Sequence, residues 1–315
     1  MKKYLVTGGA GFIGSNIVKK LLEKGEFVRV ADNLSTGKKE NIEEFFDNPN
    51  FEFIEGDLTD LDIARKSVKG IDFVLHEAAV PSVARSIEDP IKSNDSNITS
   101  TLNLLVAAKD EGVKKFVYAS SSSIYGDNPE LPKREDFPIK PISPYALTKY
   151  AGERYCQIFW QIYKFPTISL RYFNVFGPRQ DPKSQYAAVM PNFIFAFLKN
   201  ERPIIYGTGE QSRDFTFVEN VVQANILAAN SGEGNGEVLN IACGDQTSLN
   251  QLVDLLKEIT GKDIKADYQK ERQGDVLHSK ADISKAENII NYHPIVNFKD
   301  GLAKTFEWYK QNEKL

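Results

Sequence analysis

The sequence predicts an α/β protein with a doubly wound parallel sheet and a smaller C-terminal α/β substrate domain. In the first half of the chain, short β-branched or aromatic runs alternate with amphipathic stretches, the pattern of a parallel sheet covered by helices. A glycine-rich turn joins the first such run to the first amphipathic stretch, as in doubly wound folds that bind nucleotides. The length of 315 residues suits one large domain or two.

Six strands and four crossover helices are expected in the first half. The strands are Lys2–Thr7, Phe27–Asp32, Phe51–Glu55, Phe73–His76, Lys115–Ala119 and Thr167–Tyr172. The helices are Ile13–Lys24, Leu61–Val68, Ser93–Glu111 and Pro144–Tyr163, long enough for the crossovers that parallel strands require. We therefore assign residues 1–172 to the main domain.

After Tyr172, prolines and glycines interrupt the rhythm, and residues 173–315 are expected to form mainly the smaller domain. Phe215–Val218 with the helix-like Glu219–Ala229, and Val238–Ile241, are expected to return to the main sheet. Asp300–Gln311 has helical periodicity.

Composition excludes several classes of protein. A net charge of −4 with scattered lysines gives no electrostatic footprint for nucleic acid. Cys156 and Cys243 are far apart, and the three histidines lack a chelating spacing, so we expect no disulfide framework and no metal. No apolar run approaches a membrane span or a leader's apolar core, so the expected protein is soluble, uncleaved and cytoplasmic, without a membrane partner.

The glycine-rich turn Thr7–Gly14 lies between the first strand and the first helix. Glycines 8, 11 and 14 allow a tight turn, close approach of the backbone to a pyrophosphate and close helix packing, while the helix N-terminal amides face the phosphates. Such a turn alone is often only a structural loop, but its position here predicts a dinucleotide site of the Rossmann type.

Asp32, at the end of the second strand, favours NAD over NADP. A carboxylate there accepts hydrogen bonds from the adenosine ribose and repels a 2′-phosphate. It could instead cap the following turn. Asp57, after the third strand, is expected on the adenine side, although a loop aspartate is commonly only solvated.

Tyr145 and Lys149 are four residues apart in a predicted helix, which places both on one face. A phenol with a pKa of ~10 is a poor base at neutral pH, but a nearby ammonium lowers that pKa. On a solvated helix the same spacing usually has no function. The serines of Ser120–Ser123 follow the fifth strand, so their hydroxyls emerge at the ligand-binding edge of the sheet; most of them are expected to be only a polar turn.

Together these motifs resemble the extended short-chain dehydrogenase/reductases, and within them the nucleotide-sugar 4-epimerases. The resemblance runs from Lys2 to Phe306. It is carried by Gly8-x-x-Gly11-x-x-Gly14, the serine strand end with Tyr125-Gly126, Tyr145-x-x-x-Lys149, Arg171–Pro178 and Ser212–Phe215.

The resemblance implies an NAD-dependent isomerase in which tightly bound NAD takes a hydride from sugar C4 and returns it to the other face of a 4-keto intermediate. Tyr145 would carry the O4 proton, Lys149 would hold the nicotinamide ribose and lower the tyrosine pKa, and Ser121, assisted by Ser122, would hydrogen-bond O4. Related dehydratases carry an Asp-Glu pair where this chain has Ser122 and Ser123, and related decarboxylases usually carry a glutamate there, so elimination and decarboxylation are disfavoured.

The resemblance also assigns residues to the two ligands and a mode of assembly. The expected NAD contacts are Gly8, Gly11, Phe12, Ile13, Gly14, Asp32, Asn33, Ser35, Thr36, Gly37, Asp57, Leu58, Ala78, Ala79, Asn97, Tyr145, Lys149 and Tyr172. The expected contacts with a UDP-sugar are Val83, Arg85, Ser121, Ser122, Asn174, Ala188, Val189, Ile205, Tyr206, Gln211, Arg213, Arg272, Asp275 and Ser279. A homodimer would form through Ser93–Glu111 and Pro144–Tyr163, with apolar surface from Tyr150, Phe159, Trp160 and Tyr163, although these residues could also pack on the sheet.

Ser279 bears on the choice of sugar. In similar epimerases a tyrosine at this position restricts the enzyme to UDP-glucose and UDP-galactose, whereas a small residue leaves room for an N-acetyl group, although pocket size permits a substrate without selecting it. We expect interconversion of UDP-N-acetylglucosamine and UDP-N-acetylgalactosamine, and also of UDP-glucose and UDP-galactose. The alternatives are a strict UDP-glucose 4-epimerase, a nucleotide-sugar oxidoreductase of the same fold, and a silent NAD-binding regulator.

Overall fold

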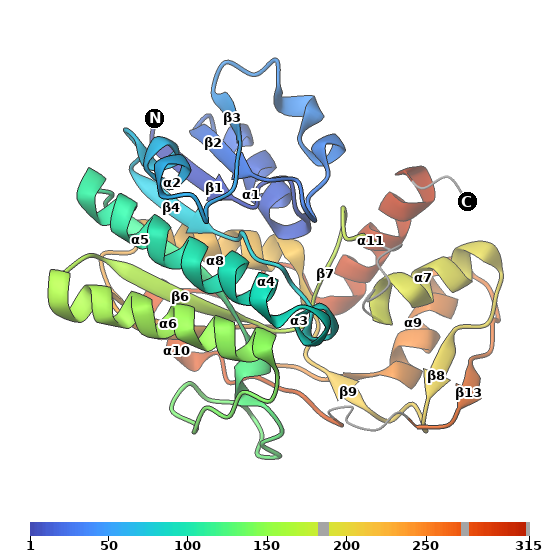
Figure 1. The fold of residues 1–315 in the computed structure, drawn as a ribbon. Coiled ribbons are helices and arrows are strands. Elements are labelled where there is room, and N and C mark those ends of the chain that lie inside the picture. Colours follow the sequence, from blue (N-terminus) through green and yellow to red (C-terminus); the bar gives the residue numbers. More distant parts are fainter. Residues whose placement is uncertain (182–188, 272–276, 313–315) are drawn as a thin grey trace.

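A seven-stranded parallel sheet forms the centre of the molecule (Figure 1). The computed structural model describes residues 1–181, 189–271 and 277–312. The strand order is β11-β6-β5-β4-β1-β2-β3. The strands are β1 (Lys3–Thr7), β2 (Phe27–Asp32), β3 (Phe51–Glu55), β4 (Phe73–His76), β5 (Lys115–Ser121), β6 (Thr167–Tyr172) and β11 (Glu237–Ile241). The predicted fold class is confirmed, and the order reverses between β1 and β4, where open α/β sheets bind ligands.

The six expected strands are all present, and β5 is longer than expected. It continues through Ser120 and Ser121, which pair in register with Arg171 and Tyr172 of β6. Two of the serines therefore belong to the strand, and a 3₁₀ turn, Ser122–Tyr125, follows them. The seventh strand, β11, pairs with β6.

Helices cover both faces of the sheet (Figure 1). One face carries α2 (Leu61–Val68), α5 (Ser100–Glu111) and α6 (Pro144–Tyr163), and the other carries α1 (Phe12–Glu23), α8 (Val218–Asn230) and α10 (Ser284–Ile290). Each face buries its own apolar cluster, one centred on Ile17, Val30 and Val221 and the other on Leu104 and Phe116.

The expected helix Ser93–Glu111 begins earlier and is not uniform. Asp89 caps α4 (Pro90–Asn94), accepting a hydrogen bond from the Lys92 amide at 2.9 Å, and proline occupies the first turn, where its missing N–H costs nothing. A π-helical turn, Asp95–Thr99, then joins α4 to α5. Such turns are frequent at functional sites, and this one passes beside the cleft described below.

The remaining elements lie beyond the carboxyl edge of the sheet, with α7, α9 and α11 grouped together in Figure 1. The helices are α3 (Val83–Glu88), α7 (Val189–Lys199), α9 (Leu249–Thr260), α11 (Phe298–Asn312) and the 3₁₀ turns Lys39–Asn41 and Glu43–Phe45. The strands form three short pairs, β7 (Val175–Phe176) with β10 (Thr216–Phe217), β9 (Ser212–Arg213) with β12 (Thr247–Ser248), and β8 (Ile204–Tyr206) with β13 (Asp267–Gln269).

The expected return of Phe215–Val218 with Glu219–Ala229 to the main sheet is wrong for the strand and right for the helix, because α8 packs against β4, β5 and β6. Phe215–Val218 contributes β10, which pairs with β7 rather than with the seven-stranded sheet. The place beside β6 is taken by β11, so the two residues of β10 pair with the segment that leaves β6.

Phe159, which we expected to supply dimer surface, is 5% exposed and packs in the core. Trp160 packs against Gly236, where an added Cβ would lie 2.3 Å from its ring, and Tyr150 packs on the cluster around Tyr125. Tyr163 alone of these four aromatic residues is largely exposed, at 54%. Within the described ranges, the helices are all too short or too polar to cross a membrane.

Candidate functional site

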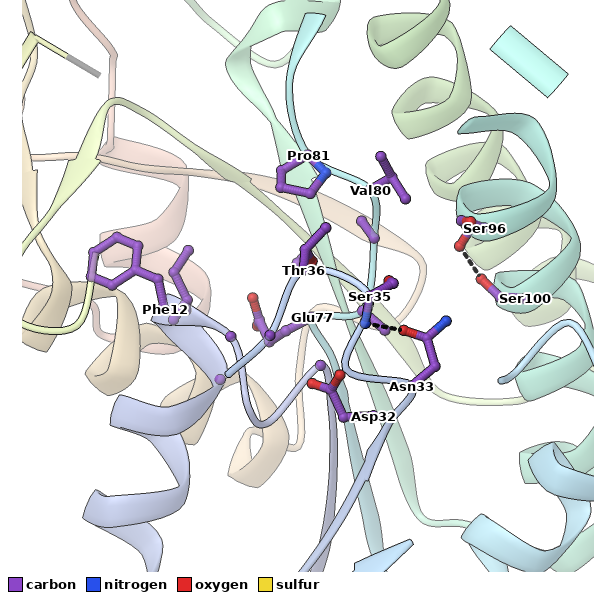
Figure 2. A pocket seen from close by; sticks show the side chains of 18 of the residues that line it. Phe12, Asp32, Asn33, Ser35, Thr36, Glu77, Val80, Pro81, Ser96 and Ser100 are labelled. Atoms are coloured by element: carbon purple, nitrogen blue, oxygen red, sulfur yellow. Dashed lines mark hydrogen bonds between the residues drawn. The ribbon is translucent and has the colours of Figure 1, made fainter. Parts of the chain in front are cut away.

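A cleft of about 440 Å³ opens where β1, β2 and β4 end (Figure 2). Of the residues expected to contact NAD, only Asn97 does not line it. Those that do are Gly8, Gly11, Phe12, Ile13, Gly14, Asp32, Asn33, Ser35, Thr36, Gly37, Asp57, Leu58, Ala78, Ala79, Tyr145, Lys149 and Tyr172. The fold thus gathers segments from six strand ends or helix starts at one site.

The glycine turn leaves no room for side chains. Gly8 has φ +63°, and a Cβ there would lie 2.8 Å from the backbone of Ala78. A Cβ on Gly14 would lie 2.2 Å from the carbonyl oxygen of Gly8, so the helix packs directly on the turn. Backbone amides at the start of α1 are therefore open to a phosphate, and the turn fits a dinucleotide.

Asp32 has the capping role that we considered as the alternative, and it also lines the cleft. Its carboxylate accepts hydrogen bonds from the amides of Ala10 at 3.0 Å and Leu34 at 2.8 Å, so it ties the glycine turn to the loop after β2. Burial raises its pKa, while these two hydrogen bonds lower it. Next to it, Asn33 donates to Asp57 at 2.8 Å, which joins the ends of β2 and β3 on the side expected to hold adenine.

Asn97 lies behind the wall of the cleft. It is 1% exposed, accepts a hydrogen bond from the Val80 amide at 2.8 Å and donates to the Thr148 hydroxyl at 3.0 Å. We expected Asn97 to contact NAD directly. Instead, its side chain points inward from the π-helical turn and holds the Val80 segment by hydrogen bonds.

Tyr145 and Lys149 project from α6 into the same cleft. Ser143 caps the helix by accepting a hydrogen bond from the Ala146 amide at 3.1 Å, and Pro144 occupies its first turn. The Tyr145 phenol is hydrogen-bonded to the Ser121 side chain at the end of β5. Lys149 is 4% exposed, and its ammonium donates to the Ala119 carbonyl at 2.7 Å, so β5 orients both members of the pair.

The electrostatics differ from our expectation that Lys149 lowers the tyrosine pKa. Burial raises the pKa of Tyr145, the Ser121 hydrogen bond lowers it, and the Glu77 charge raises it, with a net increase. Burial lowers the pKa of Lys149 to about 8, against the opposing effects of Glu77 and Glu153. At neutral pH Lys149 therefore remains mostly protonated. At Tyr145, loss of solvent contact is the largest effect and raises the pKa of the phenol.

The other serines have different environments. Ser120 lines the cleft but donates to the buried Glu153 carboxylate at 2.6 Å, which also forms a two-pronged ion pair with Arg171. Ser122 begins the 3₁₀ turn and is half-buried. The Ser123 amide donates to the Ser121 hydroxyl at 3.2 Å, so the turn itself positions Ser121.

Glu77 is a candidate that we did not identify from the sequence. It follows β4 directly and lines the cleft, where Tyr172 donates to its Oε1 at 2.7 Å. Its position after a strand of the main sheet was a usable signal, as it was for Asp32. Arg179 also lines the cleft and donates to the Ser15 carbonyl at 2.9 Å.

A second cavity of about 590 Å³ lies among α7, β8 and β9. Five expected substrate residues line it, namely Asn174, Val189, Tyr206, Gln211 and Arg213. Ile205 is fully buried and does not line it, because neighbouring strand residues face opposite sides. Arg85 lines the first cleft instead, and Val83 is 43% exposed on α3. Ala188, Arg272 and Asp275 lie outside the described residues.

Ser279 is held beside this cavity by hydrogen bonds. Its hydroxyl accepts from Asn174 Nδ2 at 3.1 Å and from the Asp214 amide at 3.4 Å, and its own amide donates to the Ser212 carbonyl at 3.1 Å. Asn174 has φ +36°, and its Nδ2 also donates to the Asp214 carbonyl. Ser279 therefore contacts one of the expected substrate residues directly.

Among the residues that the structure describes, no three His, Cys, Asp or Glu side chains are arranged to hold a metal ion.

Comparison with known proteins gives a consistent result. Residues 4–242 match the NAD dependent epimerase/dehydratase family. A putative UDP-glucose 4-epimerase of Methanocaldococcus jannaschii is 42% identical over 312 residues, which cover 98% of this chain and 99% of that protein.

Two solved structures are similar over nearly their whole length. The UDP-N-acetylglucosamine 4-epimerase of Methanobrevibacter ruminantium, in complex with UDP-N-acetylmuramic acid, has a TM-score of 0.94 and 43% identity and covers 99% of each chain. The UDP-glucose 4-epimerase of Thermotoga maritima with UDP-glucose has a TM-score of 0.91 and 42% identity, covering 98% of this chain and 99% of its own.

Proposed function

We propose that this chain, an enzyme that belongs to the NAD dependent epimerase/dehydratase family, is a UDP-sugar 4-epimerase with tightly bound NAD. The observation that carries the proposal is the meeting of Tyr145 and Lys149 in the cleft that the glycine turn opens, with Ser121 hydrogen-bonded to the Tyr145 phenol from behind the cleft lining. Bound NAD would supply reversible hydride transfer at the sugar C4 carbon.

The residues of the chain would handle the proton. Tyr145 accepts the proton from O4 and later returns it, while Ser121, already hydrogen-bonded to the phenol, orients O4. The Lys149 ammonium, fixed on the Ala119 carbonyl, would hold the nicotinamide ribose beside the reacting groups. Asp32 and the amides of the glycine turn would bind the adenosine ribose and the pyrophosphate.

The residues also separate this reaction from the dehydration that other members of the family perform. Loss of a sugar hydroxyl needs an acid to protonate the leaving group. Ser122 and Ser123, which stand where dehydratases carry an Asp-Glu pair, offer only hydroxyls. Epimerisation needs no such acid.

The substrate that we propose is UDP-N-acetylglucosamine, with UDP-glucose and UDP-galactose also accepted. Ser279 is small and lies beside Asn174, which supports a site wide enough for an N-acetyl group. The relative from Methanobrevibacter ruminantium, named for this sugar, supports the same substrate. Asn174, Gln211 and Arg213 would bind the diphosphate and sugar from the second cavity.

The test uses the chain as purified, with no cofactor added. We expect released NAD on denaturation and interconversion of UDP-N-acetylglucosamine and UDP-N-acetylgalactosamine, followed by chromatography. The four UDP-sugars compared side by side give the preference. A requirement for added NADH, consumed one for one with substrate, would instead identify a net oxidoreductase.

The homodimer is also part of the proposal. Tyr163 and Ile162, 54% and 66% exposed at the end of α6, and Ile91, 74% exposed on α4, supply apolar surface on neighbouring helices. Pairing of this face between two copies would remove that surface from water.

A further inference from the structure

Glu77 places a carboxyl group inside the cleft that is proposed to hold NAD. The proposed mechanism assigns no role to this group. Glu77 immediately follows β4, next to the point where the strand order reverses. Figure 2 shows its side chain within the cleft that Asp32, Ser35 and Thr36 also line.

A chain of hydrogen bonds from three elements fixes this carboxyl group. Asn225 of α8 donates through Nδ2 to the Tyr172 hydroxyl at 2.8 Å and to the Val221 carbonyl at 2.9 Å. Since the Tyr172 oxygen accepts from Asn225, its own proton points to Glu77 Oε1, 2.7 Å away. Glu77 therefore accepts a hydrogen bond through Oε1, and the ionised carboxylate is the better acceptor.

Glu77 lines the same cleft as Tyr145 and Lys149, which project into it from α6. Its charge raises the pKa of both side chains. His76, its neighbour on β4, is hydrogen-bonded to Thr7 and Thr101 instead. Further charged groups that line the cleft are Asp32, Lys38, Asp57, Arg85, Arg179 and Asp181.

We propose that Glu77 is a positioning residue whose carboxylate balances the Lys149 ammonium and opposes ionisation of the Tyr145 phenol. The hydrogen bond from Tyr172 holds that carboxylate at a fixed place, so its effect on both groups is built into the fold. Burial raises the pKa of Glu77 to about 7, with the Tyr172 hydrogen bond and the Lys149 charge lowering it. Its charge therefore appears near neutral pH.

The direction of the effect is the same at both partners. An ionised Glu77 raises the pKa of Lys149 and that of Tyr145. Removing the charge lowers both, so lysine loses its proton and tyrosine ionises at lower pH. No element of this prediction depends on which sugar is bound.

The first test follows the ionisation of Tyr145 itself in the protein as purified. Tyrosinate absorbance is titrated in the natural chain and in Tyr145→Phe, and the difference gives the Tyr145 midpoint. The same pair is then measured with Glu77→Gln added. We expect the midpoint to fall by about 0.5–1 pH unit. An unchanged or higher midpoint overturns the proposal.

Two controls separate charge from packing. Glu55→Gln removes an exposed carboxylate at the end of β3, outside the cleft, and is expected to leave the midpoint unchanged. Glu77→Asp keeps the charge and is expected to keep the midpoint high; a fall as large as that of Glu77→Gln overturns the proposal. If Glu77→Gln does not fold, Glu77→Met removes the same charge with an apolar side chain of similar length and is held to the same expected fall.

The kinetic test rests on the proposed epimerase function. In Glu77→Gln the alkaline limb of the kcat profile is expected to move to lower pH, because Lys149 deprotonates earlier. An unmoved limb in an active variant overturns the role of Glu77. A natural chain without epimerase activity would refute the proposed function alone, since the tyrosinate titration still decides the assignment of Glu77.

Discussion

At the scale of single residues, the chemistry of the site is controlled by desolvation as much as by charge. Spacing in the sequence brings Lys149 to Tyr145, but the surroundings raise the tyrosine pKa and lower the lysine pKa to about 8. The hydrogen bond from Ser121 is the interaction within the site that favours the phenolate. The cationic nicotinamide of bound NAD would add a second one.

Tyr145→Phe tests the base directly. Loss of the phenol oxygen removes the proton acceptor, so we expect epimerisation to fall by ~10²–10⁴-fold while NAD remains bound. Turnover is measured by chromatography and NAD by release on denaturation. Tyr163→Phe, at the exposed end of the same helix, is the control and is expected to retain full activity. Equal activity in both variants would remove Tyr145 from the mechanism.

Ser279→Tyr tests the choice of sugar. A ring beside Asn174 would fill the space proposed for the N-acetyl group, so turnover of the N-acetylated pair is expected to disappear while the UDP-glucose pair is spared. Ser279→Ala is the matched control, because it loses the hydrogen bonds from Asn174 and Asp214 but keeps the space. An unchanged preference in Ser279→Tyr, measured with all four sugars, would contradict the assignment.

At the scale of elements, a buried carboxylate joins the segments that surround the second cavity. Asp214, just after β9, is fully buried and accepts backbone hydrogen bonds from Cys243, Gly244 and Ala281 at 2.9–3.1 Å. These bonds connect the end of β11 to the segment that carries Ser279. Burial raises the pKa of Asp214 to about 6, and the three amides lower it.

Asp214→Asn is expected to destabilise the fold by ~1–3 kcal/mol, because an amide cannot accept from all three donors. The pKa of Asp214 is higher in the folded chain than in the unfolded chain, so its ionisation makes the fold less stable as the pH rises. The stabilisation by Asp214 is therefore complete below about pH 4 and is lost as the pH rises towards 6. The stability difference from the variant should therefore shrink over this range. Urea unfolding at several pH values measures it, with exposed Asp263→Asn as the control. A constant difference would contradict the raised pKa.

At the scale of the whole molecule, the sheet separates two apolar clusters, and the proposed dimer would cover the outer face of the α4 and α6 layer. Ile91, Ile162 and Tyr163 are exposed apolar side chains that this contact would cover.

Ile162→Glu tests this assembly. A charge in a buried apolar contact costs far more than on a free surface, so we expect the dimer to dissociate, as measured by sedimentation equilibrium. Ile295→Glu is the control: Ile295 is 61% exposed, and its amide donates to Asn220 of α8 on the opposite face of the sheet, so the mass should stay unchanged. A monomeric natural chain would refute the dimer without affecting the epimerase proposal.

Local patterns determined much of this protein in advance. Alternation of strands and helices gave all six expected strands, and the limits of Leu61–Val68 and Pro144–Tyr163 agree with the structure, because caps, prolines and apolar periodicity act over a few residues. The glycine turn, Asp32, Tyr145 and Lys149 were predicted for the same reason, since each depends on its place relative to one strand or helix.

Only the tertiary structure decided the features that depend on distant segments. The pairing of β10 with β7, the support role of Asn97 and the hydrogen bonds from Asn225 through Tyr172 to Glu77 join residues far apart in the chain. The same holds for the pKa of Tyr145, because desolvation is set by everything packed around a group and not by its neighbour on one helix face. Spacing in the sequence determines that Tyr145 and Lys149 lie on one helix face, and packing in the folded chain determines their pKa values.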